Sequence, residues 1–171
     1  MPVRLDGLTC LAALVLVLGP LPNAQSHNDA AASPTAKKEM ARMHATGTFN
    51  VKLTPQAAAP GIETAELSRM TIDKQFQGDL AAASLGEMLA IRTQVQGSAG
   101  YVALERVTGA LHGRTGSFVL QHSGTMDRGA SSLALTVVPD SGTGELTGLR
   151  GAMTIEIDNG KHSYTMDYVL P

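Results

Sequence analysis

From residue 44 to the end of the chain, apolar and polar side chains alternate with a period of two. In residues 44–53 the odd positions hold Ala, Gly, Phe, Val and Leu, whereas the even positions are polar. Residues 67–76 alternate in the same way, and residues 132–138 form a further short strand candidate. Because successive side chains of a strand point to opposite faces, this period predicts strands with one buried face. It argues against a helical fold.

One stretch, residues 79–96, is ambiguous. Its Ala- and Leu-rich runs suit a helix, but Ile91, Thr93 and Val95 alternate like a strand. Gly86 lies midway and interrupts either pattern. We therefore predict two short strands around a bend at Gly86.

Asn159-Gly160 predicts a hairpin near the C-terminus, because Asn-Gly is preferred in two-residue type I′ turns. The turn would pair Ile155 with Tyr164 and Met153 with Met166. Every apolar residue then faces an apolar or amphipathic partner on one side of the hairpin. Turn chemistry and alternation thus indicate the same register.

A second hairpin is predicted within residues 101–126, closed by a turn at Arg114-Thr115. This turn would pair Leu111 with Phe118 and Val107 with His122. The strands and turns together indicate about eight strands with turns every 8–12 residues, as in sandwiches and barrels. No helix is long enough to cover a sheet face, and a closed barrel removes exposed strand edges. We therefore predict an all-β fold, a single antiparallel β-barrel of about eight strands.

The N-terminal part has a different character. Residues 8–18 are almost wholly apolar, which is too short for a membrane span of ~20 residues but suits a secretory signal. We predict a signal peptide over residues 1–26, a flexible linker over 27–43 and the barrel over 44–171, giving an exported, periplasmic or secreted protein without an integral membrane span. The single cysteine, Cys10, lies in the signal, so the mature chain would hold no disulfide. A net charge of −2 argues against nucleic-acid binding.

Several blocks of the barrel region resemble a family of small bacterial proteins that carries a domain-of-unknown-function label. The blocks, in order, are residues 44–49, 73–76, 97–103, 118–126 and 138–146. The resemblance implies a compact antiparallel barrel similar to that of allene oxide cyclase and the calycins, with no established activity and no catalytic residues. Members of the family usually begin near the position of Met43. A true start at Met40 or Met43, which would make the protein cytoplasmic, therefore stays open beside export.

Three ionisable residues, Lys74, Glu105 and His122, fall on otherwise apolar faces of the predicted strands. The predicted hairpin makes Glu105 and His122 diagonal neighbours, within side-chain reach of one another. A buried carboxylate is costly unless it is paired, so we expect the three to meet. They are our candidates for acid–base catalysis, with an internal ion pair of purely structural role as the alternative.

Aromatic and apolar side chains on the same face are candidate ligand contacts. They are Tyr101, Tyr164, Tyr168, Phe118 and Met126. The histidines show no metal-binding spacing, and the glycine-rich residues 142–148 lead into a strand rather than a helix. We therefore expect neither a metal nor a cofactor.

Three functions remain open at this point. The first is binding of a small apolar or amphipathic ligand inside the barrel, where Ala103 and Gly109 leave room. The second is a cofactor-free isomerase, cyclase or lyase that uses the interior acid–base residues. The third is a structural or partner-binding protein of the cell envelope that uses exposed strand edges. The oligomeric state also stays open.

Overall fold

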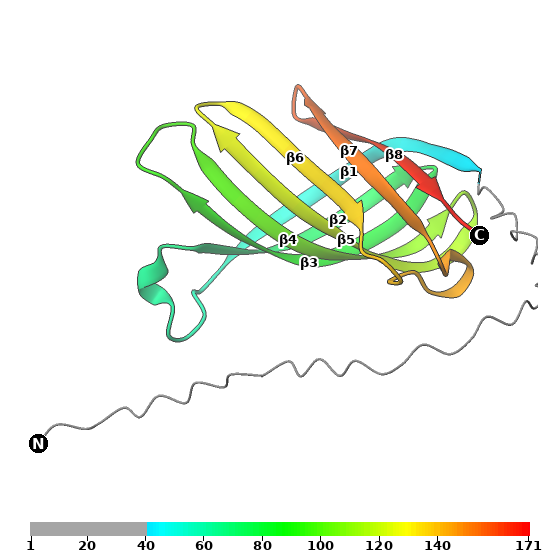
Figure 1. Ribbon diagram of the computed structural model, residues 1–171, viewed down its shortest axis with the longest axis horizontal. Coiled ribbons are helices and arrows are strands. Elements are labelled where there is room, and N and C mark those ends of the chain that lie inside the picture. Colours follow the sequence, from blue (N-terminus) through cyan, green and yellow to red (C-terminus); the bar gives the residue numbers. More distant parts are fainter. Residues whose placement is uncertain (1–40) are drawn as a thin grey trace, which may run out of the picture. The chain divides into compact units, whose positions relative to one another are not determined.

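The computed structural model describes residues 41–171, so the predicted signal peptide and nearly all of the predicted linker lie outside the described residues. Eight strands follow one another along the chain (Figure 1). They are β1 (Arg42–Gln56), β2 (Ser68–Gly78), β3 (Leu80–Arg92), β4 (Ala99–Leu111), β5 (Arg114–Asp127), β6 (Ala130–Val137), β7 (Arg150–Asp158) and β8 (Lys161–Val169). Two short 3-10 helices, η1 (Glu63–Ala65) and η2 (Gly144–Leu146), lie in connections. Because β1 begins at Arg42, the barrel starts slightly earlier than predicted.

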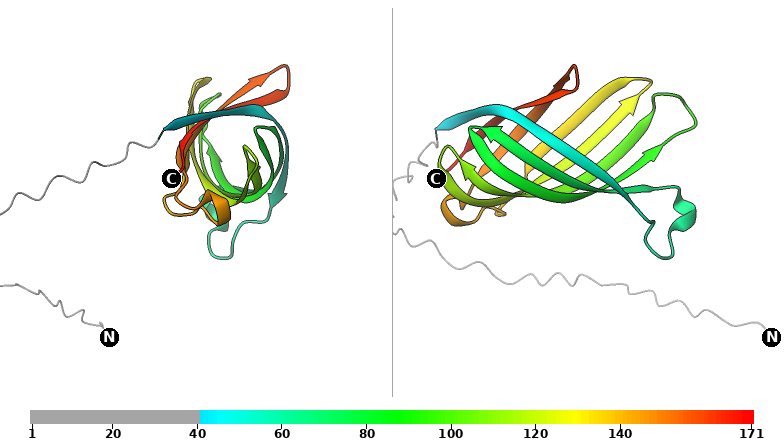
Figure 2. Two further views of the ribbon diagram at one scale, coloured as in Figure 1. Left: turned by 90° about the vertical axis from the view of Figure 1, so that its right-hand side faces the viewer. Right: turned by 180° about the vertical axis from the view of Figure 1, so that it is seen from behind.

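The strands form one closed antiparallel barrel, in which β1 pairs with β8 (Figure 2). The prediction of an all-β barrel of about eight strands is confirmed. Since every connection joins neighbouring strands, the turns alternate between two ends of the barrel. We call the end with the β1–β2, β3–β4, β5–β6 and β7–β8 connections the mouth, and the opposite end the filled end. Within the described residues, no helix is long and apolar enough to cross a membrane.

The filled end holds the hydrophobic core. Inward-facing side chains of all eight strands pack there, joined by Leu146 of η2 and by Leu149 and Leu170. Phe118 and Met166 are almost completely enclosed in this core. Burial of apolar surface at ~25 cal/mol per Å² is the main driving force for such a fold. The mouth end is therefore the part of the interior that remains free for another role.

Of the two predicted hairpin registers, one is confirmed and the other is wrong. The β7–β8 register pairs Ile155 with Tyr164 and Met153 with Met166, as predicted. The predicted β4–β5 register is wrong by four residues, since Val107 pairs with Phe118 rather than with His122. The turn lies at His112-Gly113, where both residues have positive φ angles of 47° and 78°. Gly113 adopts the left-handed conformation without steric cost, so the chain turns there and not at Arg114-Thr115.

The prediction of two short strands within residues 79–96 is also wrong. One continuous strand, β3, spans Leu80–Arg92 and pairs with β4 over its whole length. Gly86 does not end the strand but allows close approach, because a Cβ atom there would lie 2.8 Å from the Cα of Glu105. The glycine thus serves the packing of β3 on β4.

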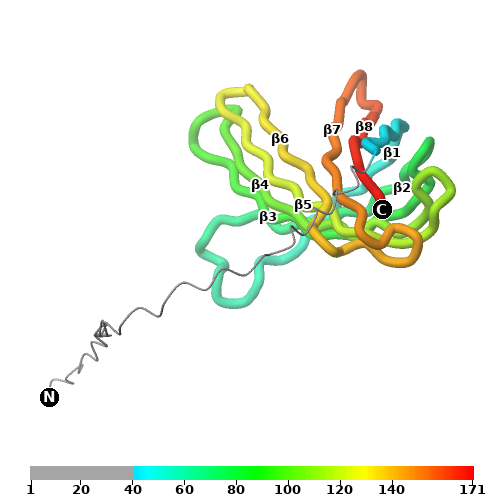
Figure 3. Tube along the Cα trace, turned by 45° about the vertical axis from the view of Figure 1, so that its right-hand side comes forward, coloured from blue at the N-terminus to red at the C-terminus, as the bar shows by residue number. Residues whose placement is uncertain are grey.

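The barrel has one weak seam. The pairing of β6 with β7 consists of a single residue pair, Thr136 with Ala152, near the filled end. From that pair toward the mouth the two strands diverge (Figure 3). By contrast, β6 pairs with β5 from Ala130 to Val137, and β7 pairs with β8 over all its residues. The mouth is therefore open on the side of this seam.

Candidate functional site

Four neighbouring strands bring a buried polar cluster together in the middle of the barrel. Lys74 comes from β2, Ser84 from β3, Glu105 from β4 and His122 from β5, all at inward-facing positions. Lys74 pairs with Ser84 in the β2–β3 ladder. In the β4–β5 ladder Ala103 pairs with His122, which places Glu105 one diagonal step away. Diagonal neighbours on one face lie within reach of long side chains.

Glu105 is the centre of the cluster. Its Oε2 atom accepts a hydrogen bond from Lys74 Nζ at 2.7 Å and lies 2.9 Å from His122 Nε2. Its Oε1 atom accepts a short hydrogen bond from Ser84 Oγ. The carboxylate has no exposure to solvent, and the other three side chains are also buried. The structure thus brings the three predicted residues together, whereas their catalytic role stays a prediction.

The electrostatics of the cluster are set by these contacts. Burial raises the pKa of Glu105, but the hydrogen bonds from His122, Lys74 and Ser84 and the attraction of the Lys74 charge outweigh it and lower the pKa to about 2. Glu105 is therefore ionised at neutral pH. The ammonium of Lys74 also lies 4.9 Å from the centroid of the Phe49 ring, a cation–π distance. The cluster is a site of paired charges, in which three side chains are hydrogen-bonded to the Glu105 carboxylate.

Ser84 is the cluster residue that sequence reasoning missed. Its even position places it on the same face as Leu80 and Ala82, and that alternation was available in the sequence. The predicted bend at Gly86 divides this strand, and the continuous buried face to which Ser84 belongs is then not recognised.

A cavity opens above the cluster at the mouth of the barrel. Its volume is about 500 Å³, and inward-facing side chains of β3 to β7 make up most of its wall. Inward-facing apolar members of the wall include Met88, Ala90, Tyr101, Met126, Leu133, Ile155 and Ile157. The Tyr101 ring lies between cavity and cluster, 6.4 Å from the His122 ring. Gly124 makes room for it, since a side chain there would collide with the ring.

The predicted ligand contacts divide between the two ends of the barrel. Tyr101 and Met126 line the cavity. Phe118, Tyr164 and Tyr168 instead pack in the core of the filled end. The hydroxyl of Tyr164 accepts a hydrogen bond from the Leu80 backbone N–H at 2.9 Å, and that of Tyr168 lies 2.7 Å from His112 Nδ1. These two tyrosines stabilise the filled end and do not face the cavity.

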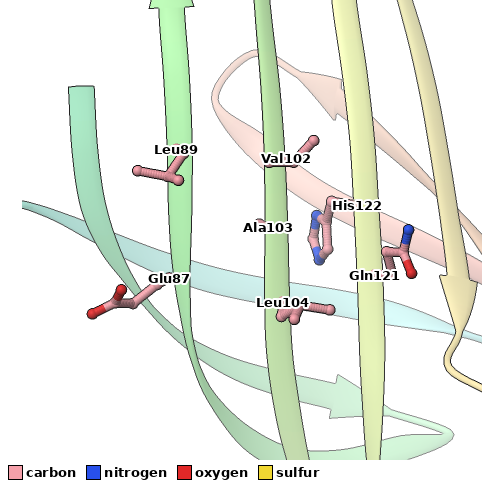
Figure 4. Close-up of a pocket in the computed structure, with 7 residues that line it drawn as sticks. All are labelled: Glu87, Leu89, Val102, Ala103, Leu104, Gln121 and His122. Atoms are coloured by element: carbon pink, nitrogen blue, oxygen red, sulfur yellow. The ribbon is translucent and has the colours of Figure 1, made fainter. Parts of the chain in front are cut away.

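A second hollow lies over the outer face of β3, β4 and β5 (Figure 4). Its wall is formed by Glu87, Leu89, Val102, Ala103, Leu104, Gln121 and His122. Val102 and Leu104 point away from the barrel interior and are more than half exposed. This hollow of about 440 Å³ is more open than the cavity, and of the buried cluster only His122 contributes to its wall. The mouth cavity is thus the better-formed site.

Metal binding finds no support in the described part of the chain, residues 41–171. No three His, Cys, Asp or Glu side chains gather there in a way that could hold a metal ion. Lys74, Glu105 and His122 of the barrel interior are instead paired with one another. The functional groups of the buried cluster are a carboxylate, an ammonium, an imidazole and a hydroxyl.

Comparison with known proteins agrees with the barrel. No curated protein matches the chain. A protein of unknown function from the DUF3224 family of Shewanella oneidensis MR-1, whose crystal structure is known, is 52% identical. The match covers 78% of this chain and 99% of that chain, with a TM-score of 0.69. The family model described as "Protein of unknown function (DUF3224)" matches residues 45–168, and the chain therefore belongs to the DUF3224 family.

Proposed function

We propose that the barrel binds a small amphipathic ligand, whose apolar body occupies the mouth cavity. The observation that carries this proposal is the half-enclosed cavity of about 500 Å³ with its apolar wall. Met126, Leu133 and Ile157 face inward there, yet they are 42%, 40% and 67% exposed. Exposed apolar surface gathered in a concave site is typical of a ligand pocket. A ligand would remove this surface from water.

Arg92 supports an anionic group at the other end of the ligand. It is the last residue of β3, lies at the rim and is the charged member of the cavity wall within residues 41–171. It forms no ion pair with another described residue. A guanidinium offers several donors to a carboxylate, sulfonate or phosphate. The ligand class is therefore an apolar molecule with one anionic group.

Two naphthalene probes test this proposal. We expect both 8-anilinonaphthalene-1-sulfonate and its neutral analogue N-phenyl-1-naphthylamine to bind with enhanced fluorescence. Arg92→Gln should weaken the sulfonate about fivefold, the size of an exposed ion pair, and leave the neutral probe unchanged. Arg128→Gln is the matched control, because Arg128 lies near the mouth but outside the cavity wall and pairs with Asp127. Fluorescence titration of both probes against the wild type and the two variants gives these affinities.

A second pair of variants locates the probes. Ala90 points into the cavity, whereas Ala83 of the same strand points outward. Ala90→Phe should abolish binding of both probes, and Ala83→Phe should not. Failure of both probes to bind would contradict the proposed cavity function. Binding that Arg92→Gln leaves unchanged would contradict only the anionic group.

One observation favours an acid–base enzyme as the second candidate function. His122 directs Nε2 to the Glu105 carboxylate, while Nδ1 has no hydrogen-bond partner in the described part of the chain. Every fully buried side-chain nitrogen and oxygen there has a partner, so Nδ1 is not completely enclosed. A carboxylate-bound imidazole with a free nitrogen is suited to act as a general base. Burial and the charge of Glu105 raise the pKa of Tyr101, so its hydroxyl stays a proton donor.

The corresponding reaction is removal of a proton from carbon next to a carbonyl. His122 Nδ1 would take the proton, the carbonyl oxygen would carry the charge, and the proton would return to carbon. With 2-decanone in D₂O, we expect the protein to accelerate deuterium incorporation at the carbon next to the carbonyl. Proton NMR measures the rate of this exchange. His122→Asn should reduce the rate about a hundredfold. His162→Asn, which removes another inward-facing histidine at the mouth, is the control. Equal rates for wild type and His122→Asn would exclude this role.

A further inference from the structure

The seam between β6 and β7 leaves two strand edges without a partner beside the cavity. Both strands are fully paired on their other sides, with β5 and with β8. Between the two, the described residues form one residue pair, Thr136 with Ala152. Backbone groups of residues 130–135 and 153–158 that face the seam thus lack ladder partners within residues 41–171. Closed barrels normally remove such edges, so this opening is unusual.

Side chains along the seam repeat on a two-residue period. Leu133 of β6 and Ile155 and Ile157 of β7 face the cavity. Glu156 and Asp158 point outward from β7, are exposed and form no ion pair with described residues. The seam therefore offers hydrogen-bonding groups along its edges, an apolar surface inside and negative charge outside.

We propose that the seam binds an extended peptide segment of a partner protein by strand addition. The segment's backbone would pair with the free edge of β6 or β7. Alternate apolar side chains would enter the cavity, and the intervening side chains would be basic and lie near Glu156 and Asp158. In strand addition the main chain supplies affinity, and pockets for alternate side chains supply specificity.

An extended peptide fits these observations better than a small ligand does. A small apolar molecule covers Leu133 and Ile157 but leaves the amide and carbonyl groups of the edges to water. A strand satisfies those groups and fills the cavity at once. Charge complementarity also selects the peptide, because the exposed carboxylates of β7 lie outside the cavity, where the outward residues of an added strand would be. The proposal does not depend on the small-ligand function.

A model peptide of about eight residues, a usual strand length, with alternating valine and lysine tests the proposal. The control is a peptide of the same composition with the valines and lysines in two separate blocks. We expect the alternating peptide to bind the full-length protein about tenfold more tightly, measured by fluorescence anisotropy. N-methylation of every second amide should remove that advantage, because it blocks the ladder hydrogen bonds and keeps the side chains.

Hydrogen exchange then identifies the site. The alternating peptide should slow exchange in residues 130–135 or 153–158, the two seam edges, and not on the outer face of β3 and β4. Glu156→Lys should weaken the peptide about fivefold, whereas Glu87→Lys, on the outer face of β3, should leave its affinity unchanged. Equal affinities for the two peptides, or protection elsewhere, would overturn the proposal. If the seam becomes protected without peptide as the protein concentration rises, a second copy of this chain occupies it, and the proposal of a partner peptide is overturned.

Discussion

Glu105→Gln is expected to lower the free energy of unfolding by about 3–5 kcal/mol, the usual effect of breaking a buried ion pair. The substitution keeps the shape of the side chain but removes the charge that balances Lys74, whose ammonium lies 2.7 Å from the carboxylate. Both side chains are buried, so water cannot take over the role of the counter-charge. Urea unfolding monitored by circular dichroism gives the change in the free energy of unfolding.

Two further variants separate this effect from a general loss of packing. Lys74→Met added to Glu105→Gln should recover part of the lost stability, because the unpaired charge is then gone. Glu87→Gln is the surface control, since Glu87 forms an exposed ion pair with Arg69 and should cost less than about 1 kcal/mol. The geometry indicates that the cluster stabilises the fold. If Glu105→Gln lowers the free energy of unfolding no more than Glu87→Gln does, this interpretation is wrong.

The faces of the strands could be predicted from the sequence, but their exact register could not. Alternation alone places Glu105 and His122 on one inner face, because the period of two decides which side each residue occupies. The β4–β5 prediction is wrong by four residues, an even shift that keeps every side chain on its correct face. Glu105 and His122 therefore remain diagonal neighbours, although the residue opposite His122 is Ala103 and not Val107.

The mouth and the seam depend on contacts that no local pattern encodes. Tyr101 and Tyr164 share the same alternation, yet one lines the cavity and the other packs in the core. The opening between β6 and β7 lies on the mouth side of Thr136–Ala152, the one residue pair that joins these strands within residues 41–171. Closure of a barrel is a non-local property, and alternation specifies faces rather than partners.

Acid should destabilise the wild type more than the Glu105→Gln variant. The pKa of Glu105 is lowered from its ordinary value of 4.5 to about 2 in the folded protein. A carboxyl group whose pKa is depressed by folding contributes stability above its unfolded pKa, and that contribution is lost as the pH falls through the folded value. The window therefore runs from about pH 4.5 down to about pH 2, and the shift corresponds to about 3 kcal/mol.

The measurement compares the free energy of unfolding of the two proteins between about pH 6 and about pH 2. At pH 6 the wild type should be more stable, and the difference should narrow as Glu105 takes up its proton. Glu145→Gln is the control, because hydrogen bonds from Thr115 lower the pKa of Glu145 while its side chain stays exposed. Solvent screens such a group, so the pH dependence of that variant should stay close to that of the wild type. Parallel curves for wild type and Glu105→Gln would show that Glu105 does not carry the acid sensitivity, and that its charge is not held by Lys74 and His122.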